Sequence, residues 1–515
     1  MVTEFVLLSN ANCALIIVFI FLFMLESVCA IKRPESNEVL PSTATKMERV
    51  QLWIHEHPTT SKIIKVVTFL FGAAMLATLP YSFAALGITA AIGIGIIGII
   101  SVAVSLVAHM VLDLVAPPQH DMKNHVFPAG QCEGGKLYYQ GDIPILTLDA
   151  DDPFIAGKAH GYLLGDSLNR VFKQVHFAVH AIAKQPRAAQ LQDAIEQIKR
   201  TIPEKYLVEM QGLVEGFKKW SSEHPLSFPT TITLEDVILL HLMPDSMHFN
   251  TSLHQKRGQH PAQAENRQKV ACAVVIDRDE NGDFLFARNM DWPSFGLAGT
   301  YSLIINRKQK GKAISTAEVG IPGFIGTITG MNAKGLSMAM NVCSGFTREV
   351  HGMPAAFFNR HCLENCKDVE DLQSFLRWNQ PLGPYHMTAA DPDEAASFHF
   401  YQSEEHGGLV KRKWKDSAPL TVLNYRYPDA YSRYGCLNST QREGTLNAWF
   451  EKAREEELPK SEKITRSLSL PYVNNGLTTH SVVMKPETRS IEVSFNNAFA
   501  AKYPRHKLST NELFS

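Results

Sequence analysis

The chain lacks an excess of charge of either sign, because 50 Lys and Arg stand against 51 Asp and Glu. Without a basic excess, it has no electrostatic basis for binding nucleic acid. The sequence also has no GxxxxGK[ST] phosphate-binding motif and no HExxH zinc motif, and its one GxGxxG, which begins at Gly93, lies inside a long apolar run. No nucleic-acid partner, nucleotide or other cofactor is therefore predicted.

Cysteine is sparse, with 8 residues in 515, and its spacing shows no disulfide-rich pattern. His176 and His180 stand four apart on a predicted helix, as two metal ligands would, but nothing in the sequence indicates a third ligand. Cys362 and Cys366 share a helical face in the same way, and core packing is the favoured interpretation. The sequence therefore predicts neither a disulfide scaffold nor a metal site.

The first 116 residues are instead rich in apolar sequence. One apolar run spans residues 12–30, and a longer one spans residues 63–115. About 20 apolar residues are enough to cross a bilayer, so the longer run is predicted to form a helical hairpin that turns near Pro80. Residues 1–116 are therefore predicted to be a transmembrane region with the lipid bilayer as a partner. A buried hairpin of a soluble core is the alternative.

The charges leave open on which side of the membrane the rest of the chain lies. Basic residues gather between the two runs, at Lys32, Arg33, Lys46, Arg49, Lys62 and Lys65. The positive-inside tendency places this linker on the cytoplasmic side, and a two-span hairpin returns the rest of the chain to that side. If residues 1–30 are a cleaved signal peptide followed by a single span, the rest of the chain lies in the lumen or periplasm.

Beyond Pro117-Pro118 the pattern is typical of a soluble domain. Apolar residues recur at helical spacing over Pro153–Trp220, Glu235–Leu242 and Ala355–Trp378. Strand-like runs stand at Tyr385–Met387, Ser397–Tyr401, Leu420–Leu423, Ser481–Met484 and Ile491–Phe495. Helices together with mainly antiparallel strands predict an α+β fold. The polar stretch Gln255–Gln268 is predicted to be an exposed loop, accessible for processing.

The most informative residue is Cys272, at the start of an apolar run. Asn281-Gly282 is a two-residue turn signal, so the runs on either side are predicted to pair as a β-hairpin. Counting outward from that turn sets Asp291 opposite Cys272 and puts Arg288 on the other face, so that a bulge would be needed to bring Arg288 to the thiol. Taken alone, Cys272 is most simply a buried strand residue.

Four segments give this cysteine a wider context. Cys272 is followed by Arg288-Asn289-Met290-Asp291, Pro322–Asn341 is a glycine-rich strand pair that ends in asparagine, Thr421–Asn438 contains Asn424, Arg433 and a Cys-Leu-Asn, and Tyr139–Asp149 is a strand. At these spacings, and over Gly135–Phe495, the chain resembles the acid ceramidase and N-acylethanolamine acid amidase family of cysteine N-terminal-nucleophile (Ntn) hydrolases. The choloylglycine hydrolases are more distant relatives in this resemblance.

The resemblance implies an αββα sandwich that follows the transmembrane region. Residues 117–271 would form a propeptide-like helical subunit and residues 272–515 the catalytic Ntn-hydrolase subunit, produced by cleavage between Ala271 and Cys272. The two subunits would remain associated. The implied catalytic residues are Cys272, Arg288, Asp291, Asn341, Asn424 and Arg433.

Such a cleavage would give the nucleophile its own base. A new α-amine on Cys272 titrates near ~7.7 to 8.0, so it can take the thiol proton near neutral pH without a histidine. Asp291 would orient the ammonium, and Arg288 would favour the thiolate. The side-chain amide of Asn424 would donate to the oxyanion, and Asn341 and Arg433 would complete the polar lining.

The implied function is that of a membrane-attached, self-processing amidase, which hydrolyses fatty-acyl amides of the ceramide or N-acylethanolamine type through a thioester on Cys272. An acyltransferase of the same class and a non-catalytic membrane-anchored binding module are the alternatives. The sequence leaves open which acyl amide is cleaved, the oligomeric state, and whether Cys132 and Cys436 bridge the two subunits.

Overall fold

The computed structural model describes residues 121–182, 195–225, 230–245, 272–292, 294, 296–343, 352–402, 407–425 and 439–514. The predicted transmembrane region, residues 1–116, lies outside these ranges, as do Ala271, Arg433 and Cys436. Among the helices within these ranges, none is both long enough and apolar enough to cross a membrane.

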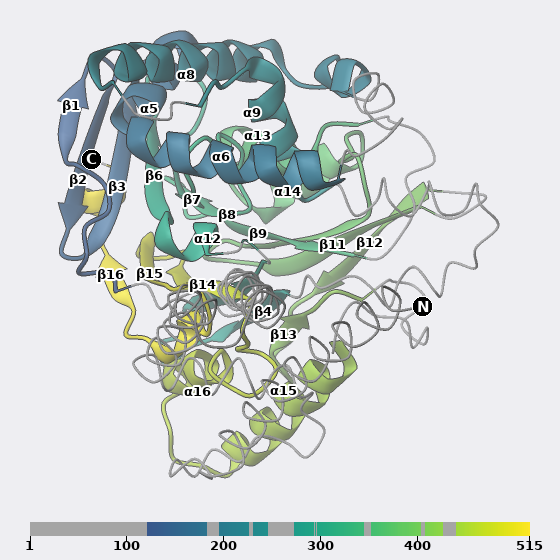
Figure 1. Cartoon of the computed structure of the whole chain (residues 1–515). Coiled ribbons are helices and arrows are strands. Elements are labelled where there is room, and N and C mark those ends of the chain that lie inside the picture. Colours follow the sequence, from purple (N-terminus) through teal and green to yellow (C-terminus); the bar gives the residue numbers. More distant parts are fainter. Residues whose placement is uncertain are drawn as a thin grey trace, which may run out of the picture. The chain divides into compact units, whose positions relative to one another are not determined.

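Two β-sheets form the centre of this part of the chain (Figure 1). Sheet A has ten described strands, in the spatial order β1 (Gly130–Cys132), β2 (Gly135–Gln140), β3 (Ile143–Asp149), β6 (Leu303–Lys308), β7 (Thr316–Gly320), β8 (Thr329–Asn332), β9 (Ser337–Val342), β10 (Tyr385–Ala390), β11 (Ala395–Gln402) and β12 (Gly407–Lys413). Sheet B has six, in the order β13 (Leu420–Val422), β4 (Cys272–Arg278), β5 (Phe284–Asp291), β14 (Thr478–Lys485), β15 (Ser490–Phe495) and β16 (His506–Leu508).

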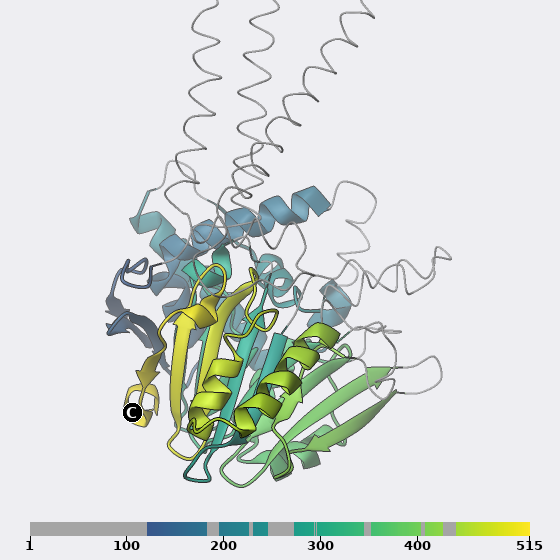
Figure 2. The ribbon, with the colours of Figure 1, turned by 90° about the horizontal axis from the view of Figure 1, so that it is seen from below.

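Helices cover the outer face of each sheet, as Figures 1 and 2 show. Sheet A is covered by α5 (Pro153–Leu163), α6 (Gly165–Ile182), α8 (Glu204–Glu223), α9 (Leu234–His241), α13 (Ala355–Asn365) and α14 (Val369–Leu376). Sheet B is covered by α15 (Ser439–Arg454) and α16 (Lys460–Ser467). Short helices are α12 (Leu297–Thr300), η1 (Ala500–Lys502) and α17 (Thr510–Phe514). The described residues therefore have the predicted α+β composition in αββα layers.

Strand alternation produces these layers. On β4, Val274 and Ile276 pack between the two sheets, whereas Ala273 and Val275 pack outward against α15 and α16. Because successive side chains point to opposite faces, a strand that is apolar at every position must be covered on both sides. The continuous apolar run after Cys272 is thus explained by a central strand between two hydrophobic layers.

Sheet A joins the two predicted subunits. Strands β1, β2 and β3 come from residues 117–271, and β6 and the strands beyond it come from residues 272–515. The junction is a parallel pairing in which Ile145 lies opposite Ile304 and Asp149 opposite Lys308. The predicted boundary at Cys272 therefore divides one continuous sheet.

Helices α5 and α8 cross in direct backbone contact. Gly157 and Gly161 of α5 face α8, and Gly212 and Gly216 of α8 face α5, at separations that leave no room for a Cβ atom at any of the four. Small residues four apart clear one stripe of each helix, which lets the backbones approach. This crossing fixes the helical layer over the first strands of sheet A.

A buried network of charges links α8 to residues 272–515. Glu209 of α8 accepts from Arg307 of β6 at 2.5 Å and from Arg360 of α13 at 2.8 Å. Arg360 also pairs with Glu364 at 2.8 Å, and Arg307 pairs with Glu318 at 3.3 Å. All five side chains are at most 5% exposed, so each charge depends on its partners for the interactions that water would otherwise supply.

One predicted helix differs from the structure. The helical spacing over Pro153–Trp220 corresponds to α5, α6 and α8, whereas the single helix predicted for Ala355–Trp378 is broken into α13 and α14. The break occurs because Asp368 accepts a hydrogen bond from the N–H of Asp371, at 2.8 Å, and so caps the start of a new helix.

Candidate active site

The hairpin that carries Cys272 turns through three residues, not through the two predicted from Asn281-Gly282. The N–H of Asp279 donates to the carbonyl of Asp283 at 2.8 Å and closes the loop. Gly282 takes the left-handed conformation, with φ of 89°, that such a loop requires. The Asp279 carboxylate accepts from the N–H groups of Asn281 and Asp283, which stabilises the longer loop.

The extra loop residue shifts the register of the hairpin by one. Cys272 pairs with Met290, and the predicted pairing with Asp291 is wrong. Arg288 then pairs with Val274, so strand alternation places it on the same face of sheet B as Cys272. The predicted need for a bulge in the strand is therefore also wrong, because the change arises in the turn.

Three side chains hold three different atoms of Cys272. The backbone N–H donates to Asn424 Oδ1 at 2.7 Å, the carbonyl oxygen accepts from Arg442 Nη1 at 2.5 Å, and Sγ lies 3.7 Å from Arg288 Nη2. Cys272 is 3% exposed and its three partners are fully buried. The amine, carbonyl and thiol positions of this residue are therefore fixed together.

Arg288 is anchored from sheet A. Its Nη1 donates to the carbonyl of Ile328 at 3.1 Å, and its Nη2 donates to the carbonyl of Met340 at 2.8 Å. Burial lowers the pKa of Arg288, and the neighbouring Cys272 raises it in opposition. Since a guanidinium is not deprotonated in proteins, these contacts hold a cation at the sulfur.

Asn424 is oriented differently from its predicted role. It was expected to donate through its amide nitrogen to an oxyanion, but here its oxygen faces the Cys272 nitrogen and its Nδ2 donates to the carbonyl of Val342 at 2.7 Å. The same oxygen accepts from Arg442 Nη2 at 2.9 Å. An amide carries a second N–H beyond the one that Val342 accepts, so the geometry assigns its oxygen to the amine position of Cys272 and leaves one donor for a reacting group.

Asp291 lies close to Cys272 although it is not opposite it. Its carboxylate accepts from Asn475 Nδ2 at 2.6 Å and from Thr478 Oγ1 at 2.7 Å. Burial raises the pKa of Asp291 to about 6, and Arg442, Thr478, Asn475 and Arg288 oppose this rise. The pKa of this buried carboxyl is thus closer to neutral pH than that of an ordinary aspartate.

Asn341, at the end of β9, completes the polar groups between the two sheets. Its Nδ2 donates to the carbonyl of Val422 at 3.1 Å, and Val422 pairs with Val274, two residues along β4 from Cys272. Its Oδ1 has no hydrogen-bond partner among the described residues. The structure therefore brings Cys272, Arg288, Asp291 and Asn424 together and places Asn341 beside them.

The sequence missed Arg442. It stands in the first turn of α15, where it donates to Ser439 Oγ at 3.0 Å as well as to Cys272 and Asn424. The predicted arginine, Arg433, lies outside the described residues, so its role stays a prediction. The only sequence signal for Arg442 was that a second arginine stands nine residues after Arg433.

The surroundings of Cys272 favour the neutral form of its thiol. Burial raises the pKa of Cys272, and Arg288 is the largest of the opposing influences, followed by the backbone N–H of Asp291 and by Arg442. A thiol held in its neutral form is a weak nucleophile. The arrangement becomes reactive if a base appears at the Cys272 nitrogen, where Asn424 Oδ1 already accepts a hydrogen bond.

One protein-family model matches part of the chain. A family model described as "Acyl-coenzyme A:6-aminopenicillanic acid acyl-transferase" matches residues 278–448, which is less than half of the chain. Among curated protein sequences, none matches the chain.

Similar solved structures include an N-acylethanolamine-hydrolyzing acid amidase (NAAA) ortholog of Caenorhabditis elegans. It is 15% identical over 42% of this chain and 93% of its own, with a TM-score of 0.35. Two structures of the conjugated bile acid hydrolase of Clostridium perfringens are each 14% identical over 47% of this chain, with a TM-score of 0.33. They are covered over 92% and 98% of their own lengths.

Proposed function

We propose that this chain, a distant relative of the Ntn hydrolases, is a self-processing cysteine amidase that hydrolyses fatty-acyl amides through a thioester on Cys272. The observation that supports this most directly is the separate engagement of the nitrogen, carbonyl and sulfur of Cys272 by Asn424, Arg442 and Arg288. A cysteine that only fills the core does not need a buried guanidinium at its sulfur.

Processing would begin with the Cys272 thiol. The sulfur adds to the carbonyl carbon of Ala271, the bond from that carbon to the Cys272 nitrogen breaks, and the nitrogen takes up the thiol proton. The product is a thioester between Ala271 and Sγ, with a free α-amine on Cys272. Water then hydrolyses the thioester, which leaves a carboxylate on Ala271 and a thiol on Cys272.

The same residue would then cleave an amide. The α-amine takes the thiol proton, the sulfur adds to the acyl carbonyl, and the amine of the substrate leaves with that proton. Asn424 Oδ1 lies at the Cys272 nitrogen and would hold the ammonium, and Asp291 adds a negative charge nearby. Water releases the fatty acid from the thioester and restores the thiol.

The predicted transmembrane region is what favours a lipid substrate. Met340 and Val342 flank Asn341 on β9, but strand alternation turns their side chains to the other face of sheet A, where they pack with Ala355 of α13. The carbonyls of Met340 and Ile328 also anchor Arg288. A ceramide or an N-acylethanolamine supplies an amide with a long apolar acyl chain, and such substrates reside in bilayers, where the predicted transmembrane region would hold the enzyme.

An acyltransferase is the second candidate, and the matching family description favours it. The thioester would form in the same way, but an amine or alcohol would take the acyl group in place of water. Product analysis with and without added acceptor amines separates the two candidates, since only a transferase forms a new amide in water.

The decisive experiment is to sequence the N-terminus of the purified full chain. We expect two fragments that copurify, one beginning at Cys272, and fatty-acid release from a panel of ceramides, N-acylethanolamines and bile-salt amides. Cys272→Ala should remain a single inactive chain, and the buried-cysteine control Cys362→Ser should be processed normally. An uncut wild-type chain with full amidase activity would refute the mechanism.

A further inference from the structure

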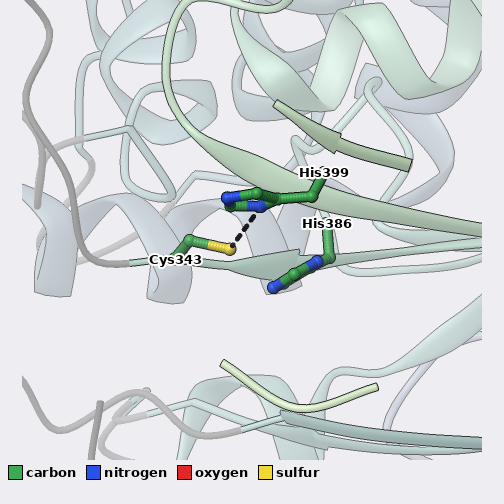
Figure 3. A group of neighbouring side chains, drawn as sticks. All are labelled: Cys343, His386 and His399. Carbon is green, nitrogen blue, oxygen red and sulfur yellow. Dashed lines mark hydrogen bonds between the residues drawn. The ribbon is translucent and has the colours of Figure 1, made fainter. Parts of the chain in front are cut away.

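Three side chains of types that bind metals lie close together between the two sheets, and none of them takes part in the proposed mechanism. Cys343 follows β9, His386 lies on β10 and His399 lies on β11, and Figure 3 shows the sulfur directed at the His399 ring with the His386 ring beside it. One potential ligand atom from each of the three lies within 4.8 Å of the others. Cys343 is fully buried, and the two histidines are 1% and 2% exposed.

Sheet geometry explains why the three converge. His386 and His399 are directly opposite each other in the β10–β11 ladder, and their ring centroids are 4.4 Å apart. Asn341 is the β9 partner of His386, so Cys343, two residues further on, continues along the same face of the sheet. The cluster is therefore built on three neighbouring strands, which are rigid elements for holding ligands.

The separation of two of these ligand atoms is close to that around a tetrahedral ion. A Zn²⁺ ion with a sulfur at about 2.3 Å and a nitrogen at about 2.0 Å places these two ligand atoms about 3.5 Å apart. Cys343 Sγ and His399 Nδ1 are 3.7 Å apart. A thiolate with two imidazoles is also a donor set that favours zinc or copper over magnesium or calcium.

The second contact of His386 sets its tautomer. Its Nε2 lies 2.6 Å from the carbonyl of Tyr425, which can only accept, so Nε2 carries the proton and the lone pair of a neutral ring is on Nδ1. A carbonyl that accepts from the remote nitrogen is the usual support of a metal-binding histidine.

We propose that Cys343, His386 and His399 bind a Zn²⁺ ion. The ion would cross-link β9, β10 and β11. Through the His386–Tyr425 hydrogen bond it would also fix the segment that carries Asn424, whose oxygen accepts from the Cys272 nitrogen. Its place in the protein is thus a structural support behind the nucleophile.

The test is the metal content of the full chain, purified without a histidine tag from zinc-supplemented culture. We expect about one zinc per chain that survives dialysis, and intense sulfur-to-metal absorption after Co²⁺ replaces it. Cys343→Ser and His399→Gln should each lower the zinc content at least tenfold. Cys362→Ser and Cys272→Ala should keep it, which separates this site from other buried thiols and from the nucleophile.

A wild-type chain that retains no more zinc than Cys343→Ser overturns the proposal and leaves a thiol hydrogen-bonded to an imidazole. If a variant fails to fold, chelation and reconstitution of the wild-type chain decide. Zn²⁺ should restore the Tm and Mg²⁺ should not, and equal effects of the two ions would also overturn the proposal.

Discussion

Arg288 and Cys272 lie on the same face of sheet B, two strand positions apart across the hairpin, with Nη2 3.7 Å from Sγ. The five-residue span from Asp279 to Asp283 creates this relationship, because it sets the register of the two strands. A loop far from the thiol thereby decides which side chain neighbours it.

Replacing Arg288 should reduce the fraction of Cys272 that is present as thiolate, without unfolding the chain. In Arg288→Gln the cation that opposes the burial effect on the Cys272 pKa is lost, so the thiol pKa rises further. We expect amide hydrolysis to fall by about 10²–10³-fold, as on removal of a catalytic electrostatic contact. The pH at which the alkylation rate of the Cys272 thiol reaches half of its maximum should be higher than in the wild-type chain.

Arg278→Gln is the matched control for Arg288, because Arg278 stands on the same hairpin but contacts the turn carbonyl of Gly282. Its alkylation profile should equal that of the wild-type chain. An unchanged profile in Arg288→Gln would show that the guanidinium does not act on the thiol.

Arg442 and Arg433 can be distinguished by mutation. Arg442 donates to both Cys272 O and Asn424 Oδ1, and a glutamine side chain cannot replace two charged contacts. We therefore expect Arg442→Gln to lower both the rate of processing and kcat by about tenfold to a hundredfold, because charge-assisted hydrogen bonds are lost. Arg433→Gln should have a smaller effect. The reverse order would assign the predicted role to Arg433 after all.

The buried charges between α8 and α13 should be costly to break. Arg360→Met leaves Glu209 and Glu364 without one of their cations, at a cost of about 3–5 kcal/mol in the free energy of unfolding. Urea unfolding measures this loss. Lys218→Met removes an exposed partner of Glu215 and should change little. Equal effects of the two variants would mean that the network contributes no more than a surface pair.

Asp245 should make stability depend on pH. Burial raises its pKa to about 7, against the hydrogen bond from the Tyr385 hydroxyl at 2.6 Å. The folded state therefore binds this proton more tightly than the unfolded chain, whose carboxyl titrates near ~3.9. By linkage, this group's contribution to the free energy of unfolding is largest at low pH, falls as pH rises from about 4 to about 7, and is constant above that.

Asp245→Asn carries no titrating proton, so its Tm should vary less between pH 4 and pH 7 than that of the wild-type chain. The exposed-carboxylate variant Glu215→Gln is the control, and its Tm should follow the wild-type curve. A parallel curve for Asp245→Asn would show that Asp245 titrates alike in the folded and unfolded chains.

The sequence predicted the parts of the fold that rest on local pattern. The hairpin after Cys272, the helix at Glu235–Leu242 and the strands near the C-terminus follow from periodicity. The turn was misjudged because Asn281-Gly282 suits a loop of two or three residues. The Asp279 carboxylate, which favours the longer loop, acts through contacts that no pattern records.

The site was harder to predict where partners come from distant elements. Arg442 reaches Cys272 across 170 positions of the sequence, from the first turn of a helix on the other side of the sheet. Asn424 was selected correctly as a neighbour of Cys272, but which end of its amide faces the nitrogen depends on Val342 and Arg442. The orientation of a buried amide depends on which donors and acceptors surround it in the folded protein, and the spacing of residues along the chain does not reveal these partners.

The parallel pairing of β3 with β6 has a consequence for how this protein is made. A break before Cys272 would leave two polypeptides that share one sheet, so their later unfolding would become a dissociation whose midpoint depends on protein concentration. Such a break would have to follow folding, because only the intact chain could form this sheet in a unimolecular reaction. After it, thermally unfolded protein would have to refold by association of two polypeptides.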